Sequence, residues 1–147
     1  AYLRGEVRAM RPRGAEVVKV AITAARLSDC LPLTQVTRDR PTVAIAMGPA
    51  GMPTRILAAH FGSCWSYAGN GVAPGQIPAE RLVDEFRFRE VTAATAVYGV
   101  VGSAAGASRS PGLHNAWFRD AGIDALYVPL QAGEFPRLLP LPRGRGG

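Results

Sequence analysis

The sequence is almost without lysine. Lys19 is the only lysine among 17 basic residues, so the net charge of +6 comes almost wholly from arginine. Arginine keeps its proton near neutral pH and cannot supply a nucleophilic amine. Lysine chemistry, if the chain performs any, must therefore use Lys19, and routine surface charge does not explain why this one lysine is present.

Cysteine is equally scarce, and long apolar runs are missing. Cys30 and Cys64 lack the paired spacing of a zinc or redox site, and we expect two buried or chemically indifferent thiols and no metal. No apolar run approaches the roughly 18 residues that span a bilayer, and the first residues do not have the pattern of a signal segment. We therefore expect a cytoplasmic location and no membrane partner.

Clusters of one charge are also lacking. The arginines are scattered from Arg4 to Arg145, with acidic residues between them, and the aromatic residues fall within the apolar pattern. A small basic module that binds nucleic acid would need clustered arginines and exposed stacking aromatics. This binding module is the alternative function, ranked below an enzyme, and we expect no nucleic-acid partner.

Strands and helices alternate along the first ninety residues. The β-branched and apolar runs predict strands at 15–22, 42–47 and 64–68, and helices from Ser28, over 53–61 and over 78–88. This alternation is typical of a parallel α/β sheet or barrel, which the pattern does not distinguish. A further β-α-β unit follows, with strands at 95–102 and 125–130 and a helix from Ser110, the expected N-cap, to about 121.

Lys19 lies within the first predicted strand. Alternation places it on one face with Val17 and Ala21, among apolar neighbours. Desolvation disfavours the charged form of an amine and leaves the lone pair free to attack a ketone, which makes Lys19 a candidate Schiff-base residue. The alternative is a lysine whose long side chain reaches solvent from the end of the strand.

Five segments resemble type I 3-dehydroquinate dehydratases in order and spacing: residues 14–21, 43–48, 51–55, 61–63 and 73–77. The resemblance implies that Lys19 forms an imine with the ketone of 3-dehydroquinate, which leads to 3-dehydroshikimate. It implies that Arg55 grips the substrate carboxylate, that Gln76 hydrogen-bonds substrate hydroxyls, and that Met47 and Tyr67 line the pocket. The plainer alternatives are a surface helix arginine for Arg55, a turn residue that caps the next helix for Gln76, and core packing for Met47 and Tyr67.

The family's histidine base and supporting carboxylates lie upstream of its lysine and have no counterpart here. His60 does not match that base, and we interpret it as a partly exposed helix histidine. A barrel needs all its strands for closure. We therefore expect the isolated chain to be marginally folded and catalytically inert.

A second resemblance begins at Tyr98. Residues 98–102, 108–115 and 127–130 are similar to the opening of shikimate dehydrogenases, which implies that Ser108 and Ser110 bind the carboxylate of shikimate. Helix capping is the alternative role for Ser110. The family's NADP domain would lie beyond Gly147, so we expect no cofactor in this chain. The cluster Gly69, Gly71 and Gly75 does not have dinucleotide spacing.

These observations predict a fragment of a bifunctional enzyme of aromatic amino-acid biosynthesis. Its fold class is α/β, with the last three strand-helix units of a TIM barrel followed by the first β-α-β unit of a shikimate dehydrogenase substrate domain. The expected domains are residues 1–91 and 95–139, with a disordered tail at 140–147. A non-catalytic remnant that binds a shikimate-like carboxylate remains an alternative, and the sequence leaves the oligomeric state open.

Overall fold

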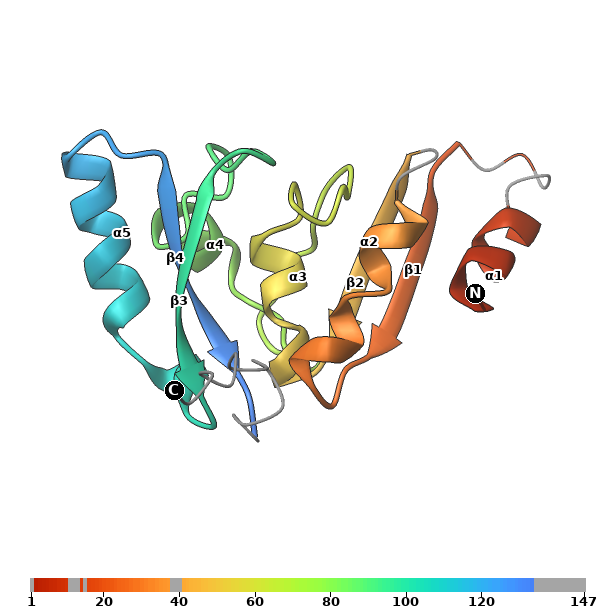
Figure 1. Ribbon diagram of the computed structural model, residues 1–147, viewed down its shortest axis with the longest axis horizontal. Coiled ribbons are helices and arrows are strands. Elements are labelled where there is room, and N and C mark those ends of the chain that lie inside the picture. The colour runs from red at the N-terminus through yellow and green to blue at the C-terminus, as the bar shows by residue number, and fades with distance from the viewer. Residues whose placement is uncertain (1, 11–13, 15, 38–40, 134–147) are drawn as a thin grey trace, which may run out of the picture.

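The described residues form two separate two-stranded parallel sheets, joined by short helices and loops. The computed structural model describes residues 2–10, 14, 16–37 and 41–133, so the expected tail at 140–147 lies outside the described residues. Figure 1 shows the two pairs of strands on either side of α3, with α5 beyond one pair and α1 beyond the other. In chain order the helices and strands are α1 (Tyr2–Met10), β1 (Val18–Thr23), α2 (Leu33–Val36), β2 (Thr42–Met47), α3 (Pro53–Ile56), α4 (Ala79–Asp84), β3 (Ala96–Gly102), α5 (Ser110–Asp120) and β4 (Ala125–Gln131).

The first sheet pairs β1 with β2, and Lys19 lies beside Val43 in the register. One face carries Val18, Val20, Ala44 and Ala46, which form a buried core cluster with residues of α1 and α2. The other face of β1 is exposed at Lys19, Ala21 and Thr23. The predicted alternation of faces along this strand is therefore confirmed, and so is the parallel pairing.

The expected third strand at residues 64–68 is wrong. At the start of this segment the Cys64 N–H donates to the Thr42 carbonyl of β2 (3.0 Å), and just before it the Ser63 hydroxyl accepts from the Ala44 N–H (3.0 Å). No described strand follows on the far side of the segment. A short run with two aromatic residues but without strand partners has no ladder to hold it extended, because strand stability comes from pairing and packing.

The helices are shorter than predicted, and one was missed. The helix expected from Ser28 is split at Pro32 into a 3₁₀ turn at Leu27–Cys30 and α2, because proline has no N–H to continue the helical ladder. The helix expected at 53–61 is regular only over α3, and that at 78–88 only over α4. Helix α1 was not predicted.

The second unit matches its prediction closely. Strands β3 and β4 are parallel with Tyr98 beside Tyr127, and α5 connects them. The Asn115 amide completes the outer edge of β4: its Nδ2 donates to the Tyr127 carbonyl (2.9 Å), and its Oδ1 accepts from the Tyr127 N–H (2.7 Å). At Tyr127, a single buried side chain thus makes the two backbone hydrogen bonds that a neighbouring strand could make.

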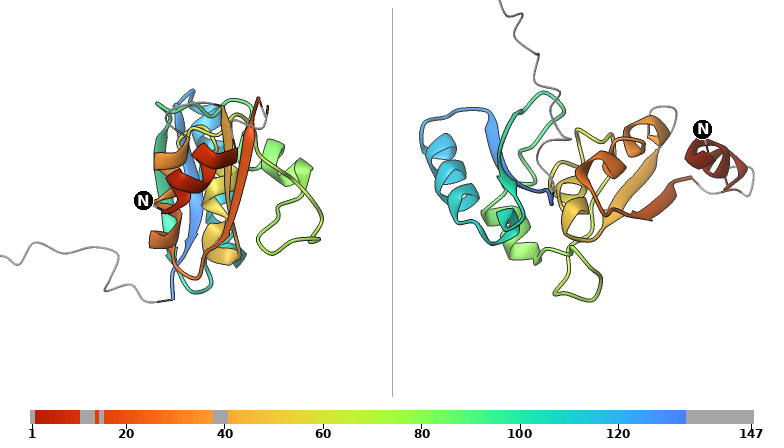
Figure 2. Two further views of the ribbon diagram at one scale, coloured as in Figure 1. Left: turned by 90° about the vertical axis from the view of Figure 1, so that its right-hand side faces the viewer. Right: turned by 60° about the horizontal axis from the view of Figure 1, so that its bottom comes forward.

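One apolar core joins the two units. Buried Ile56, Leu57, Ile77, Leu82 and Phe86 pack in one cluster with Leu126 and Val128 of β4. Residues from both sides of the predicted domain boundary therefore share a core. Figure 2 shows α1 and α2 on one side of the first sheet, and α4 with the loop before it on the other.

Candidate functional site

Lys19 is exposed to solvent, contrary to the expected dry environment. It lies near the start of β1, on the face that the core cluster does not cover. Strand β1 has only β2 as a partner among the described strands, so no further strand is present to enclose this face. The sequence identifies the apolar neighbours of Lys19 along the strand. Whether this face is buried depends on which other segments cover it, and such segments are distant in the sequence.

Tyr67 is the residue that meets the lysine side chain. The Lys19 Nζ lies 4.2 Å from the centre of the Tyr67 ring, within the range of a cation–π interaction. The tyrosine is half-buried in the irregular segment that follows Cys64. Two residues singled out from the sequence, 48 positions apart, are thus brought into contact.

Arg55 is buried rather than on the surface. Only 3 % of it is exposed, in the single-turn helix α3. Its Nε is buried without a hydrogen-bond partner, and no acidic residue in the described part of the chain forms an ion pair with it. Burial lowers the pKa of this guanidinium from its ordinary value. A buried cation without a counter-ion is a site where an anion would bind favourably.

Gln76 closes its own loop. Its Oε1 accepts a hydrogen bond from the Ala73 N–H (3.0 Å), and its amide lies so close to Gly69 that a Cβ there would be 2.8 Å from Oε1. The alternative role for Gln76, capping of the next helix, is not what this bond does, because α4 has Pro78 at its N-cap and no side-chain cap. A substrate-binding role for the same amide is not visible in these contacts.

The loop of Gln76 docks on the end of β2. The Gly48 N–H donates to the Pro74 carbonyl (3.1 Å), and Gly75, with φ of +77°, has no room for a Cβ against the Gly48 carbonyl oxygen. Met47, half-buried, is the residue before Gly48. Gly75 therefore allows the loop to pack closely against the backbone at the end of β2.

Ser108 lines an open groove of about 430 Å³ between α4 and the start of α5. Its Oγ accepts from the Ser110 N–H (3.2 Å), so Ser108, rather than Ser110, supplies the hydroxyl before α5. Ser110 is the first residue of the helix, not its N-cap. The groove is also lined by Arg81, Glu85 and Arg109. Neither arginine was predicted as a site residue, because arginines scattered along the sequence do not indicate which of them the fold brings together.

His60 links the two units; it is partly exposed, as predicted, but it does not lie on a helix. It lies beyond the end of α3, is half-buried, and its Nε2–H donates to the Thr95 carbonyl (2.9 Å). Its Nδ1 is buried without a partner. The interpretation as a helix histidine is wrong, because the chain leaves the helical path after Ile56.

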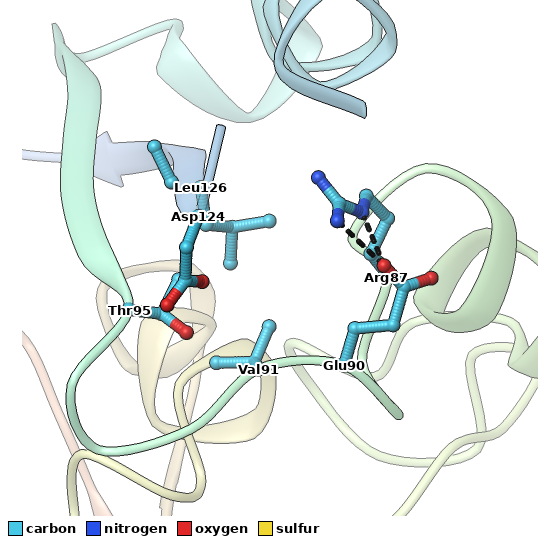
Figure 3. A pocket seen from close by; sticks show the side chains of 7 residues that line it. Arg87, Glu90, Val91, Thr95, Asp124 and Leu126 are labelled. Carbon is cyan, nitrogen blue, oxygen red and sulfur yellow. Dashed lines mark hydrogen bonds and ion pairs between the residues drawn. The ribbon is translucent and has the colours of Figure 1, made fainter. Parts of the chain in front are cut away.

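A small pocket lies next to this link, between residues 87–95 and the start of β4 (Figure 3). Arg87 and Glu90 form an ion pair on one side, and Thr95 and Asp124 lie on the other. Its volume of about 10 Å³ is room for one water molecule at most. It is therefore not a substrate site.

The two cysteines differ in their surroundings. Cys30 is buried, and burial raises the pKa of its thiol from 9.0 to about 11. Cys64 is exposed. The expectation of a buried or inert thiol thus holds for Cys30, while Cys64 faces solvent. No helix within the described residues has both the length and the apolar character needed to cross a membrane.

The sequence of this chain is similar to those of several known proteins. A family model described as type I 3-dehydroquinase matches residues 3–93. A bifunctional 3-dehydroquinate dehydratase/shikimate dehydrogenase of Arabidopsis thaliana, described as chloroplastic, is 33 % identical over 134 residues, which is 87 % of this chain and 22 % of the relative. A 3-dehydroquinate dehydratase of Lactococcus lactis subsp. cremoris is 40 % identical over 83 residues, 51 % of this chain and 36 % of the relative.

A solved structure is also similar to part of this chain. The crystal structure of 3-dehydroquinate dehydratase from Geobacillus kaustophilus has 34 % identity and a TM-score of 0.51, over 55 % of this chain and 35 % of that one. The chain thus spans about a fifth to a third of the length of these proteins. The bifunctional relative matches well beyond residue 93, whereas the single-function relatives match about half of the chain.

Proposed function

Because the chain belongs to the type I 3-dehydroquinase family, by its match over residues 3–93, we propose that it is part of an enzyme that dehydrates 3-dehydroquinate to 3-dehydroshikimate through a Schiff base on Lys19. The observation that carries this proposal is that the only lysine of the chain lies inside the family match, on a parallel strand. An imine requires a primary amine, and no arginine can replace it.

The proposed covalent step conserves atoms and charge. The Lys19 nitrogen bonds to the ketone carbon, the ketone oxygen leaves as water, and the protonated imine that results withdraws electrons from the adjacent carbon. A proton on that carbon then becomes easier to remove, which permits elimination of a hydroxyl group as water. A general base takes up that proton, and hydrolysis of the product imine then consumes one water molecule, releases 3-dehydroshikimate and returns the Lys19 amine.

Arg55 is the proposed anchor of the substrate carboxylate. Its support is the buried guanidinium with an unpaired Nε. A guanidinium can donate two parallel hydrogen bonds to one carboxylate, which fixes both position and orientation. Gln76, Met47 and Tyr67 are proposed to complete the pocket, and the docking of the Gln76 loop beside Met47 supports placing these two together.

We further propose that residues after 95 begin a shikimate dehydrogenase unit. Its support is the bifunctional relative, whose match covers 87 % of the chain. Ser108, in the groove with Arg81 and Arg109, is then proposed to bind the carboxylate of shikimate together with Ser110. NADP would bind to a part of such an enzyme that this chain does not contain.

Borohydride reduction tests the Schiff-base proposal. In an intact parent enzyme, reduction in the presence of 3-dehydroquinate should trap one covalent adduct, which mass spectrometry of peptides would locate at Lys19. Lys19→Met should abolish the adduct, and Lys19→Arg serves as the matched control because it keeps the charge but not the nucleophile. An adduct that persists in Lys19→Met would remove this residue from the mechanism.

A further inference from the structure

The contact between Lys19 and Tyr67 places the lysine nitrogen over the face of the tyrosine ring. The ammonium lies 4.2 Å from the ring centre, over the negative face of the aromatic quadrupole. Lys19 is exposed, so water competes for the same charge. The ring therefore stabilises the ammonium form of Lys19 only weakly, by the amount typical of an exposed cation–π pair.

Imine formation leaves the charge where it is. An ammonium and a ketone give a protonated imine and one water molecule, and the nitrogen carries one positive charge before and after. The two cations differ in hydration and shape, since the ammonium is a compact, strongly hydrated point charge with three donors, whereas a protonated imine is planar and has one N–H. Planar, weakly hydrated cations stack on aromatic faces better, as the guanidinium of arginine shows.

The geometry points to Tyr67 as a positioning residue that favours the protonated imine of Lys19 over both the free amine and the neutral imine. This inference rests on the proposed function, which supplies the imine. The feature that matters is the ring face and not the hydroxyl, because the lysine nitrogen lies over the ring centre. Tyr67→Phe should therefore preserve the effect, and a non-aromatic residue should remove it.

The single lysine makes a direct test possible in this chain. Lysine labelled with ¹³C at Cε gives one side-chain signal, from Lys19 alone. In the wild-type chain and in Tyr67→Phe, the attached protons should be shifted upfield by the ring, and in Tyr67→Leu this shift should vanish. Trp65→Leu is the matched control, because Trp65 is a neighbouring exposed aromatic residue.

Glyoxylate then serves as the carbonyl probe. Separate signals of free and imine-linked Lys19 give the equilibrium constant for imine formation at fixed pH. We expect this constant to be equal in wild type, Tyr67→Phe and Trp65→Leu, and about two- to five-fold lower in Tyr67→Leu. Circular dichroism verifies the fold of each variant, and Tyr67→Met takes the place of Tyr67→Leu if the latter unfolds.

The outcomes separate the two proposals. An imine constant that does not change when the ring is removed overturns the role of Tyr67, whatever happens to the proton shift. Failure of the proposed function would show differently: the intact parent enzyme would give no borohydride adduct with 3-dehydroquinate, while the glyoxylate imine and its dependence on Tyr67 would still be measured in this chain.

Discussion

At the scale of single residues, the site shows how exposure and burial change the meaning of a charge. Lys19 and Arg55 both carry a formal positive charge, but Lys19 is open to water and Arg55 is 3 % exposed with a buried, unpaired Nε. Water screens the first charge and cannot screen the second. A substitution of Arg55 should therefore change the free energy of unfolding far more than a substitution of Lys19.

Arg55→Met should stabilise the chain. The substitution keeps the length of the side chain and removes a buried cation that has no counter-ion, so we expect the free energy of unfolding to rise by about 1–4 kcal/mol. Urea unfolding measures it. Arg119→Met, at an exposed arginine on α5, is the control and should change stability by less than about 0.5 kcal/mol.

In an intact parent, the same Arg55→Met substitution should weaken substrate binding. A stabilising variant that loses its substrate affinity is expected of a residue kept for binding at a cost in stability. A clear loss of stability in Arg55→Met would show instead that the guanidinium is paired when the chain is in solution.

At the scale of elements, the loop of residues 69–77 depends on one glycine. Gly75 has φ of +77° and presses against the Gly48 carbonyl, at the end of β2 where Met47 also lies. Gly71 has a similar φ of +84°, but a Cβ there would meet nothing within 4 Å. Both glycines therefore have a positive φ that disfavours other residues, but only Gly75 also lies too close to the Gly48 carbonyl to leave room for a Cβ.

Gly75→Ala should destabilise the chain more than Gly71→Ala. Both substitutions carry the cost of a left-handed conformation, about 1–2 kcal/mol, and Gly75→Ala adds the displacement of the loop from β2, about 1–3 kcal/mol more. Urea unfolding gives the totals, and faster proteolysis within residues 69–77 should accompany Gly75→Ala alone. Equal losses in both variants would contradict the docked loop.

At the scale of the whole molecule, the shared core and the link from His60 to Thr95 tie together two units that the sequence predicts as separate domains. Elements that share one buried cluster lose their packing together, which makes unfolding cooperative. The two tryptophans are well placed to report this, because Trp65 precedes the predicted boundary and Trp117 lies on α5.

Single-tryptophan chains should unfold in one transition. Trp117→Phe leaves Trp65 as the fluorescent reporter, and Trp65→Phe leaves Trp117. We expect the same urea midpoint from both variants. Leu126→Ala, in β4, should lower both midpoints by the same amount, equivalent to about 2–5 kcal/mol, since it leaves a cavity in the common core.

The control is Leu31→Ala, at a leucine that is 65 % exposed, which should shift neither midpoint appreciably. Two distinct midpoints, or an effect of Leu126→Ala on the Trp117 reporter only, would show that the units unfold independently.

Local pattern was sufficient for much of this protein. The strand at 42–47 was predicted with its observed bounds, and β3, α5 and β4 to within one residue at each end, because apolar runs bounded by glycine and proline act over a few residues. The kinship with type I 3-dehydroquinases was also readable from short motifs in order and was confirmed by comparison. The roles of Lys19, Arg55, Gln76, Ser108 and Ser110 stay predictions.

Tertiary structure decided the rest, because burial and contact are properties of segments distant in sequence. Strand propensity at 64–68 could not make a strand without a second neighbour, and apolar flanks could not bury Lys19 without a covering layer. The Tyr67 ring over the lysine, the buried Arg55 and the core shared with β4 likewise depend on how the chain packs. The sequence by itself determined which chemical groups are available, and the packing determined which of them meet.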